Sequence, residues 1–308
     1  MDTVSGSEPF STAVIYNSAA GARLLDERYG ALLDAWPVPH ERLRVPSRAG
    51  ETFVVASGPP DAPPVLLLHG SGTNAAMWQG DVPTWAGRFR VYAVDVIGEP
   101  GRSAPARPPL GSDAYAGWLD DVLAGLGLDR ASIVGASLGG WLAVDYATRR
   151  PERVDRLVLL CPGGIGRQKW AVLIPVLLLM PFGRWGKRAA MRLYLGRPPR
   201  GLPASGVRRF LDHMLLVQRH FRPRRERLPV FDDGTLRRLT MPVLVIAGER
   251  DAALDSRDTR RRLARTVPHA TVRLLPGVGH FPAGQAQPIL EFLLQNPRDV
   301  RDCPRRHP

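Results

Sequence analysis

Ser137 lies in a Gly-x-Ser-x-Gly pattern at the abrupt end of a short apolar run. The segment reads Ser132-Ile133-Val134-Gly135-Ala136-Ser137-Leu138-Gly139-Gly140-Trp141, and a helical pattern continues to Arg149. A strand, a sharp turn and a helix in this order hold a serine hydroxyl clear of the backbone, and flanking glycines remove Cβ atoms that would collide there. The first helical turn directs free N–H groups at negative charge beside that hydroxyl. The pattern therefore predicts a nucleophilic serine, against the alternative of a glycine-rich corner without a chemical role.

Two ionisable residues follow later apolar runs that are typical of buried strands. Asp251 comes after 243–247, and His280 comes after 271–275 and a glycine-containing turn. The carboxyl ends of parallel strands meet at one edge of a sheet, so both side chains are expected near Ser137. A neutral imidazole can take the serine proton near pH 7, and a carboxylate fixes the imidazole tautomer. The chain order Ser, Asp, His therefore predicts a catalytic triad.

A second glycine-rich loop, Leu68-His69-Gly70-Ser71-Gly72, follows another apolar run. Its backbone can present the N–H of Ser71 to a developing oxyanion, and Leu138 can supply a second donor from behind the serine. We expect His69 to order this loop rather than to act as a base. The alternative is an ordinary tight turn. The residues expected to line a substrate pocket are His69, Gly70, Gly72, Trp170 and Leu173.

Other acidic residues compete for the role of Asp251. Asp255 lies four residues later and is expected to cap the following helix, while Glu249 belongs to the same turn. Asp95 is expected to order the loop after its strand. The chain has no Cys/His spacing typical of a metal site and no dinucleotide-binding glycine pattern, so we expect neither a metal nor a cofactor.

The composition is that of a soluble globular protein. The chain has 308 residues, of which 44% are hydrophobic and 23% charged. Its two cysteines, Cys161 and Cys303, do not make a disulfide framework, and no signal peptide is visible, so a cytoplasmic location is expected. The apolar run 170–182 has 13 residues, whereas a bilayer needs about 20, so no stable membrane insertion is expected. We also expect no nucleic-acid partner.

The net charge of +13 is concentrated in one segment. Between Pro162 and Thr240 there are 17 Lys and Arg against 4 Asp and Glu, and the rest of the chain is balanced. These basic residues are scattered, so we interpret them as a solvated face, against the alternative that they attract anionic substrates or an acidic membrane surface. The apolar run 170–182 in the same segment is expected to line the substrate pocket.

Apolar runs and helical patterns alternate along most of the chain. We expect strands at 41–45, 51–56, 65–68, 90–96, 132–135, 154–160, 242–247 and 271–275, and helices at 18–35, 112–126, 138–149, 255–267 and 285–294. This alternation predicts an α/β fold: a mainly parallel, twisted sheet with helices on both faces. We expect a core at 1–161, which includes an N-terminal helical extension, and at 240–296, an inserted helical cap at 162–239 and a disordered tail at 297–308.

Over about Trp36 to Leu294 the chain resembles the α/β-hydrolase superfamily, and in particular bacterial carboxylesterases of the naproxen-esterase type. The residues that carry the closer resemblance are Trp36-Pro37-Val38-Pro39, Ala62-Pro63-Pro64, Tyr92-Ala93-Val94-Asp95-Val96-Ile97-Gly98 and Trp118-Leu119-Asp120-Asp121-Val122. The resemblance implies Ser137 as nucleophile, His280 as base, and Ser71 with Leu138 as oxyanion donors. Its members have glutamate as the acid, whereas this chain has Asp251, the commoner choice in the superfamily. The cap segment of this chain is poorly similar to that of these esterases, so the resemblance does not imply that the substrate is the same.

These observations together predict a serine hydrolase that cleaves a small hydrophobic carboxylic ester through an acyl-enzyme, with no prediction of its oligomeric state. Two alternatives remain open. The same triad serves C–C bond hydrolases and cofactor-free perhydrolases. A non-catalytic member of the fold could instead only bind a ligand.

Overall fold

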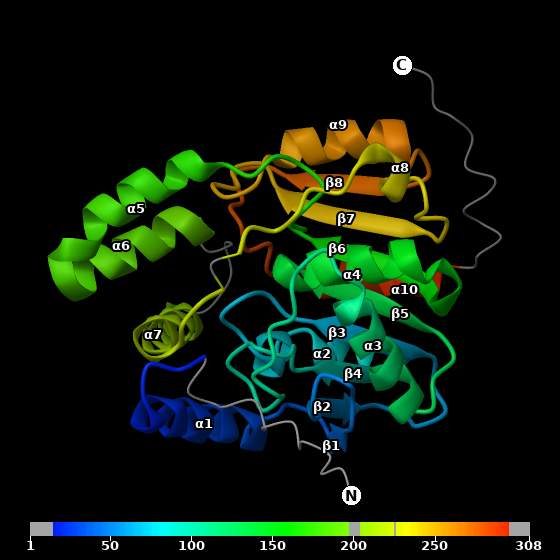
Figure 1. Cartoon of the computed structure of the whole chain (residues 1–308), viewed down its shortest axis with the longest axis horizontal. Helices are drawn as coiled ribbons and strands as arrows, with labels where there is room; N and C mark the ends of the chain where they lie inside the picture. Colours follow the sequence, from blue (N-terminus) through cyan, green and yellow to red (C-terminus); the bar gives the residue numbers. More distant parts are fainter. Residues whose placement is uncertain (1–14, 197–203, 225, 296–308) are drawn as a thin grey trace, which may run out of the picture.

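An eight-stranded sheet forms the centre of the protein (Figure 1). The computed structural model describes residues 15–196, 204–224 and 226–295. The strands are β1 (His40–Val45), β2 (Thr52–Ser57), β3 (Pro64–Leu68), β4 (Arg90–Val94), β5 (Ala131–Ala136), β6 (Val154–Leu160), β7 (Val243–Gly248) and β8 (Thr271–Leu275). They lie in the order β1-β2-β4-β3-β5-β6-β7-β8. Strand β2 runs antiparallel to β1 and β4, and the neighbouring pairs from β4 to β8 are parallel.

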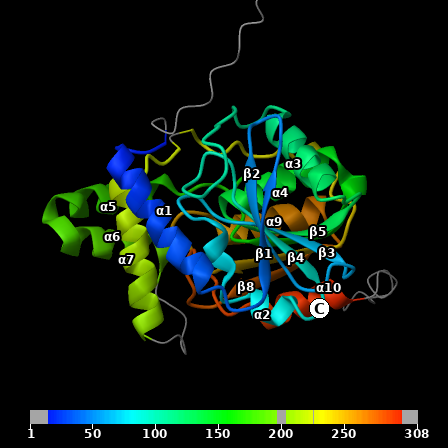
Figure 2. The same cartoon turned by 90° about the horizontal axis from the view of Figure 1, so that it is seen from below.

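Helices cover both faces of the sheet (Figures 1 and 2). The helices of the core are α1 (Ala19–Asp34), α2 (Val82–Trp85), α3 (Ala114–Gly125), α4 (Leu138–Arg149), α9 (Ser256–Thr266) and α10 (Ala286–Leu294), with the 3-10 turns η2 (Ala75–Trp78) and η3 (Pro151–Arg153). Helices α3, α4 and α9 pack on one face, and α1, α2 and α10 pack on the other. The predicted fold class is confirmed.

Strand β3 shows why its apolar run is continuous. Leu66 and Leu68 pack in the cluster that contains α3 and α4, whereas Val65 and Leu67 pack in the cluster on the opposite face. Because successive side chains of a strand point to opposite faces, a strand covered on both sides must be apolar at every position. All four side chains are fully buried.

The predicted core elements are all present, with ends that differ by a few residues. The first two strands pair in antiparallel fashion, with His40 opposite Ser57 and Val45 opposite Thr52. The short segments η2 and α2, between β3 and β4, were not predicted from the sequence. They are only four residues each, too short to give a periodic pattern.

The chain between β6 and β7 leaves the sheet and forms a group of helices at one side of it (Figures 1 and 2). They are η4 (Trp170–Val172), α5 (Leu173–Leu179), η5 (Met180–Phe182), α6 (Gly183–Leu195) and α7 (Ala204–His220), whereas α8 (Asp233–Leu236) follows them and packs on α9. We propose that 162–239 is the cap and that 1–161 and 240–296 form the core. The predicted tail at 297–308 lies outside the described residues. Among the helices that the structure describes, none is long and apolar enough to cross a membrane.

Four large side chains of the apolar run 170–182, Ile174, Leu177, Leu178 and Phe182, are exposed to solvent. Their helix packs on α6 through other residues. That this run lines a substrate pocket stays a prediction. The side chains of Trp170 and Leu173, which were also expected in the pocket, lie outside those that the structure describes.

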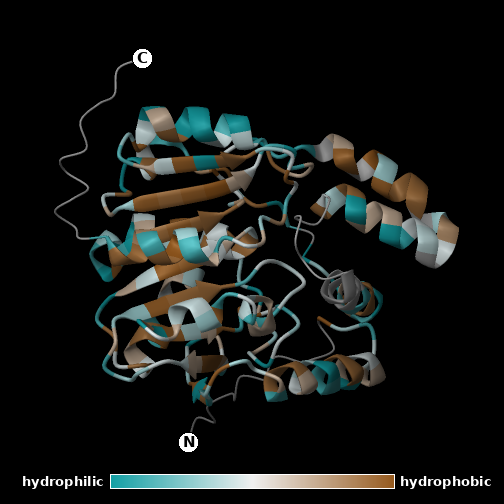
Figure 3. Cartoon of the chain, turned by 180° about the vertical axis from the view of Figure 1, so that it is seen from behind, coloured by the Kyte–Doolittle hydropathy of each residue, from teal (hydrophilic) through white to brown (hydrophobic). Residues whose placement is uncertain are grey.

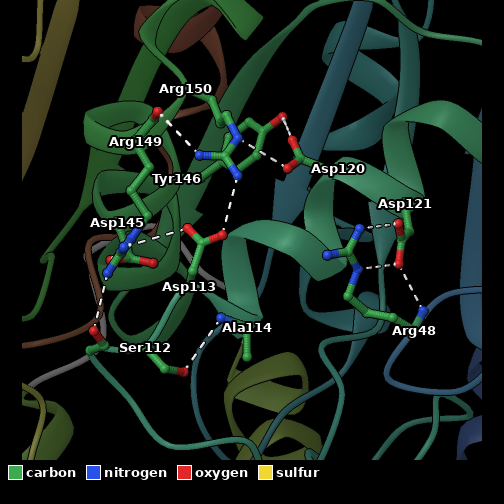
Figure 4. Close-up of polar contacts among 11 residues, drawn as sticks. Arg48, Ser112, Asp113, Ala114, Asp120, Asp121, Asp145, Tyr146, Arg149 and Arg150 are labelled. Atoms are coloured by element: carbon green, nitrogen blue, oxygen red, sulfur yellow. Dashed lines mark hydrogen bonds and ion pairs between the residues drawn. The ribbon is translucent and has the colours of Figure 1, made fainter.

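A network of charged side chains joins α3 to the last turns of α4 (Figure 4). Asp120 accepts hydrogen bonds from Tyr146 Oη and from Arg150 Nε, both at 3.0 Å. Arg149 and Arg150 also contact the carboxylate of Asp113. The helix that begins immediately after Ser137 is therefore anchored to its neighbour at its far end.

The first turn of α4 depends on glycine. A Cβ atom on Gly139 would lie 2.1 Å from the carbonyl oxygen of Leu68 and 2.6 Å from that of His69. Gly139→Ala should therefore lower the free energy of unfolding by about 1–3 kcal/mol or more, because backbone must move to admit the methyl group. The measurement is equilibrium denaturation in urea. Gly87→Ala is the control, since nothing lies within 4 Å of a Cβ at that position. Equal stability of the two variants would contradict the close packing described here.

Candidate active site

Ser137 occupies a strained turn between β5 and α4. Its backbone angles are φ 52° and ψ −107°, and it is one of two non-glycine residues with positive φ among those described, the other being Cys161. Such a conformation persists only where the surroundings impose it. A Cβ on Gly135 would lie 2.4 Å from the carbonyl oxygen of Gly139, so the glycine on each side of the serine is required by close backbone contact.

The structure brings the three predicted triad residues together. His280 Nε2 lies 3.0 Å from Ser137 Oγ, and His280 Nδ1 lies 2.7 Å from Asp251 Oδ2. Asp251 follows β7, and His280 follows β8, so all three side chains stand at the carboxyl ends of parallel strands. The imidazole and the carboxylate are buried, whereas the serine is partly exposed. A continuous hydrogen-bonded path therefore runs from a buried carboxylate to an accessible hydroxyl.

Asp251 is held as an anion. Burial alone would raise the pKa of its carboxyl group, but the hydrogen bond from His280 and those from two backbone N–H groups outweigh this, and the pKa lies below its usual value. The backbone donors are Ala253 and Leu254, at 2.8 and 3.0 Å from Oδ1. An ionised Asp251 favours the tautomer in which Nδ1 of His280 carries the proton. In that tautomer Nε2 is free to accept a proton from Ser137.

The competing acids have other partners. Asp255 accepts a hydrogen bond from the backbone N–H of Asp258 at 3.0 Å and caps the N-terminus of α9, as expected. Glu249 forms an ion pair with Arg257 at 2.7 Å near the surface. Among these three carboxylates, Asp251 is the one that contacts His280.

His69 orders the loop after β3. Its Nε2 accepts a hydrogen bond from the backbone N–H of Val96 at 2.9 Å, and its Nδ1 lies 2.9 Å from the carbonyl oxygen of Gly70. The ring is fully buried, and burial lowers its pKa to about 4, so it is neutral at physiological pH. The expectation that His69 also lines a substrate pocket is wrong, because both ring nitrogens are occupied and no part of the ring is exposed.

The loop that His69 orders passes beside the nucleophile. A Cβ on Gly70 would lie 3.6 Å from Ser137 Cβ, and Ser71 follows it at the surface. Leu138 is the first residue of α4, so its N–H has no carbonyl one turn earlier within the helix. A carbonyl carbon attached to Ser137 Oγ would thus have backbone amides on two sides. Gly72 has φ 70° and lies farther out, where a Cβ would meet Val217 of α7 at 3.9 Å.

The comparisons with known proteins agree with this geometry. Residues 65–292, more than half of the chain, match the family model described as alpha/beta hydrolase family. The chain belongs to the alpha/beta hydrolase family.

This hydrolase is similar to carboxylesterases of Bacillus subtilis. It is 30% identical to carboxylesterase YbfK over 283 residues, which cover 87% of this chain and 92% of that protein. It is 31% identical to carboxylesterase nap, a protein named as uncharacterized, over 82% of this chain and 85% of the relative. The crystal structure of carboxylesterase CesB (YbfK) superposes with a TM-score of 0.76 and covers 90% of this chain and 99% of that one. The structure of naproxen esterase from the same organism gives a TM-score of 0.75 at 28% identity, over 90% and 98% of the two chains.

The predicted resemblance to the naproxen-esterase group is therefore confirmed. The names of these relatives state the enzyme class of those proteins and do not identify a physiological ester.

One buried carboxylate near the site of this hydrolase was missed by the sequence analysis. Glu99 Oε2 accepts a hydrogen bond from the backbone N–H of Gly72 at 2.6 Å and lies 3.4 Å from Ser71 Oγ. Burial raises the pKa of Glu99 to about 7, although the Gly72 N–H and the nearby guanidinium groups of Arg107 and Arg224 lower it. Glu99 thus ties down the loop that carries the predicted oxyanion donor. The sequence signal for Glu99 was an acidic residue within a glycine- and proline-containing loop, Gly98-Glu99-Pro100-Gly101.

Three possible metal ligands also meet in this hydrolase. Atoms of Cys161, Asp251 and His280 lie within 4.8 Å of one another, and all three residues are buried. Asp251 and His280 are already hydrogen-bonded to each other at 2.7 Å. Burial and the nearby Asp251 carboxylate raise the pKa of the Cys161 thiol well above its usual value, so it stays protonated. Because a metal is bound by the thiolate, this donor set fits a metal poorly.

Glu99→Ala tests the link between this carboxylate and the loop. The variant leaves the Gly72 N–H without its acceptor, which should cost about 1–3 kcal/mol of folding free energy and lower kcat with little change in KM. Glu99→Gln should recover most of both properties, because its amide oxygen can accept the same hydrogen bond. Thermal denaturation and steady-state kinetics on an aryl ester provide the measurements.

Glu51→Ala is the control, since Glu51 forms an ion pair with Arg44 at the surface, far from the loop. The assigned role is wrong if Glu99→Ala matches this control in both stability and kcat.

Proposed function

We propose that this protein hydrolyses carboxylic esters through an acyl-enzyme formed on Ser137. It is a carboxylic ester hydrolase, in keeping with relatives that are named carboxylesterases at about 30% identity. The observation that carries the mechanism is the hydrogen-bonded path from Asp251 through His280 to Ser137 Oγ, at 2.7 and 3.0 Å. A buried carboxylate, an imidazole and a partly exposed serine in this geometry can activate an alcohol nucleophile.

In the first half of the reaction His280 Nε2 takes the proton of Ser137 as Oγ attacks the ester carbonyl carbon. Asp251 stabilises the imidazolium that forms, because it remains an anion at the Nδ1 side of the ring. His280 then gives the proton to the oxygen of the leaving alcohol as the C–O bond breaks. The product is an acyl group on Ser137 and a free alcohol.

In the second half water replaces the alcohol. His280 takes a proton from the water as it attacks the acyl carbon, and it returns this proton to Ser137 Oγ when the acid leaves. In both halves the carbonyl oxygen becomes an oxyanion, which we assign to the N–H groups of Ser71 and Leu138. Each donor of this kind typically accounts for ~10²–10³ in turnover.

The substrate we propose is a small hydrophobic ester. Cations near the triad and Glu99 already have partners: Lys169 Nζ donates a hydrogen bond to the carbonyl oxygen of Asp251 at 2.9 Å, and Arg224 forms an ion pair with Glu226 at 2.6 Å. Tyr194 of α6 contributes an aromatic wall, with its ring centre 5.4 Å from that of His280. An aromatic side chain beside the base favours an apolar substituent over a charged one.

Ser137→Ala tests the nucleophile. Turnover of a neutral aryl ester should fall by several orders of magnitude while the fold is retained, because no acyl-enzyme can form. A fluorophosphonate probe should label the natural protein and leave the variant unlabelled, as seen by mass spectrometry. A well-folded variant that keeps its activity would refute the mechanism.

The same measurements separate the alternatives. Labelling without ester turnover, together with cleavage of a vinylogous diketone, would place the protein among C–C bond hydrolases. Neither labelling nor turnover in the natural protein would favour a ligand-binding member of the fold.

Asp251→Asn tests the acid. The amide favours the wrong imidazole tautomer, so kcat should fall on the order of 10⁴-fold, as for the equivalent change in a serine protease triad. Asp255→Asn and Glu249→Gln are matched controls that remove one charge from the same turn, and both should retain activity within about ten-fold. If Asp255→Asn lowers kcat as much as Asp251→Asn does, the role of the acid belongs to Asp255.

A further inference from the structure

The pair of helices α5 and α6, joined by η5, carries the most exposed large apolar side chains that the structure describes. They are Ile174 (64% exposed), Leu177 (67%), Leu178 (68%), Phe182 (64%) and Trp185 (69%). We call these five residues the hairpin patch. Isolated exposed apolar residues are common on protein surfaces, but five large ones on a single helical hairpin indicate an interaction surface.

The hairpin patch lies on a projecting part of the molecule. Figures 1 and 2 show α5 and α6 extending side by side away from the sheet, and Figure 3 shows that α5 is hydrophobic over most of its length. Helix α5 packs on α6, α6 on α7, and α7 on α1. The rings of Phe182 and Trp185 pack edge-on, with centres 6.2 Å apart, where the chain turns from η5 into α6.

The two helices of this hairpin pack through small residues and leave the large ones outside. A Cβ on Gly186 would lie 1.8 Å from the carbonyl oxygen of Leu179, and Ala190 is 2% exposed. The inner face of the pair is therefore already filled. The hairpin patch contributes little to holding the helices together, so its side chains are available for a partner.

The charge of this segment is uniform. From Pro162 to Leu211 the chain has ten Lys and Arg and no Asp or Glu. On α6, Arg188 pairs with Asp212 at 2.7 Å, whereas Lys187 and Arg192 have no carboxylate partner within the described residues. Apolar and aromatic side chains beside unpaired cations are the composition of helices that lie in the surface of an anionic membrane.

We propose that the hairpin patch docks this protein on the surface of an anionic lipid bilayer. Phe182 and Trp185 enter the boundary between headgroups and acyl chains, and Lys187 and Arg192 contact the anionic headgroups. The helices lie on the surface and do not cross it, in agreement with their length. A symmetric pair of chains joined through the same patch would bring the like charges of Lys187 and Arg192 from both copies together, which opposes that arrangement.

Helix α6 also connects the hairpin patch to the candidate active site. The C-terminal end of α6 reaches the base, since the Tyr194 ring contacts that of His280 and Gly196 lies against Gly279. The candidate active site would then lie about 14 Å from Trp185, which is the distance along α6 from Trp185 to Tyr194, within reach of a hydrophobic ester that leaves the bilayer. This consequence rests on the proposed function, whereas the docking itself does not.

Vesicle co-sedimentation with the full-length protein tests the docking. Vesicles of phosphatidylglycerol and phosphatidylcholine in equal parts should bind the protein at least about ten-fold more tightly than vesicles of phosphatidylcholine alone. Salt should weaken the binding, because it screens the cations. No binding to the anionic vesicles overturns the proposal.

Two double variants separate the apolar and charged contributions. Phe182→Ser with Trp185→Ser should reduce binding to the anionic vesicles about ten-fold or more, because both side chains leave the interface. Lys187→Glu with Arg192→Glu should reduce it similarly and abolish its salt dependence. The controls are Leu294→Ser, an apolar residue 53% exposed on α10, and Arg88→Glu with Arg238→Glu, which make the same change of charge elsewhere.

Binding that is reduced equally by the controls overturns the proposal, because general hydrophobicity or net charge would then explain it. Light scattering after size exclusion gives the oligomeric state of each protein. If the natural chain is a dimer that the apolar double variant dissociates, and it does not bind vesicles, the patch joins two copies instead. Circular dichroism monitors folding of every variant, and fluorophosphonate labelling of Ser137 is measured separately as a test of the proposed function, so failure of the proposed function leaves the docking result intact.

Discussion

The site depends on one backbone contact, the approach of the first turn of α4 to the end of β3. The Cα of Gly139 lies so close to the carbonyl oxygens of Leu68 and His69 that no side chain fits between them. This contact holds Ser137 at a φ of 52°, which an isolated serine would rarely adopt. Because His69 begins the loop that passes beside Ser137, the same contact also sets the distance between the hydroxyl and the loop amides. The nucleophile and the proposed oxyanion donors are thus positioned by a single piece of packing.

The order of the strands supplies the rest of the site. Strands β5, β6, β7 and β8 are consecutive neighbours in the sheet, so the turns after β7 and β8 open at the same edge as Ser137. Asp251 and His280 are therefore brought to the serine by hydrogen-bonded strands rather than by flexible loops alone. The hydrogen bond between Ser137 and His280 joins residues 143 positions apart. A preorganised arrangement of this kind avoids reorganisation during the reaction.

Much of this could be predicted because the strands that carry the site are buried on both faces. Such strands must be continuous apolar runs, as in 65–68, and the residue types just beyond their ends then identify the chemistry. Glu99 could not be assigned in this way. Its hydrogen bond to Gly72 spans 27 positions and depends on how two loops pack after the sheet has formed.

The cap was harder to predict for a different reason. The run 170–182 is apolar at nearly every position, so its pattern does not indicate which face is covered. The structure shows that Gly186 and Ala190, which have almost no side chain, make the inner contact. The larger residues then remain outside. The orientation of the run 170–182 therefore depends on small residues outside it, namely Gly186 and Ala190.

The glycine pair formed by Gly196 and Gly279 joins the proposed cap to the turn that carries His280. Gly196 has a φ of 83°, and its Cα lies 2.6 Å from the Cβ position of Gly279, the residue before His280. Neither residue can gain a side chain without moving the other. The cap is therefore not freely interchangeable on this core. A recombinant chimera with a crossover between these two positions would take one residue of this contact from each parent. The workable boundaries for such a domain exchange are those that keep both glycines from the same parent.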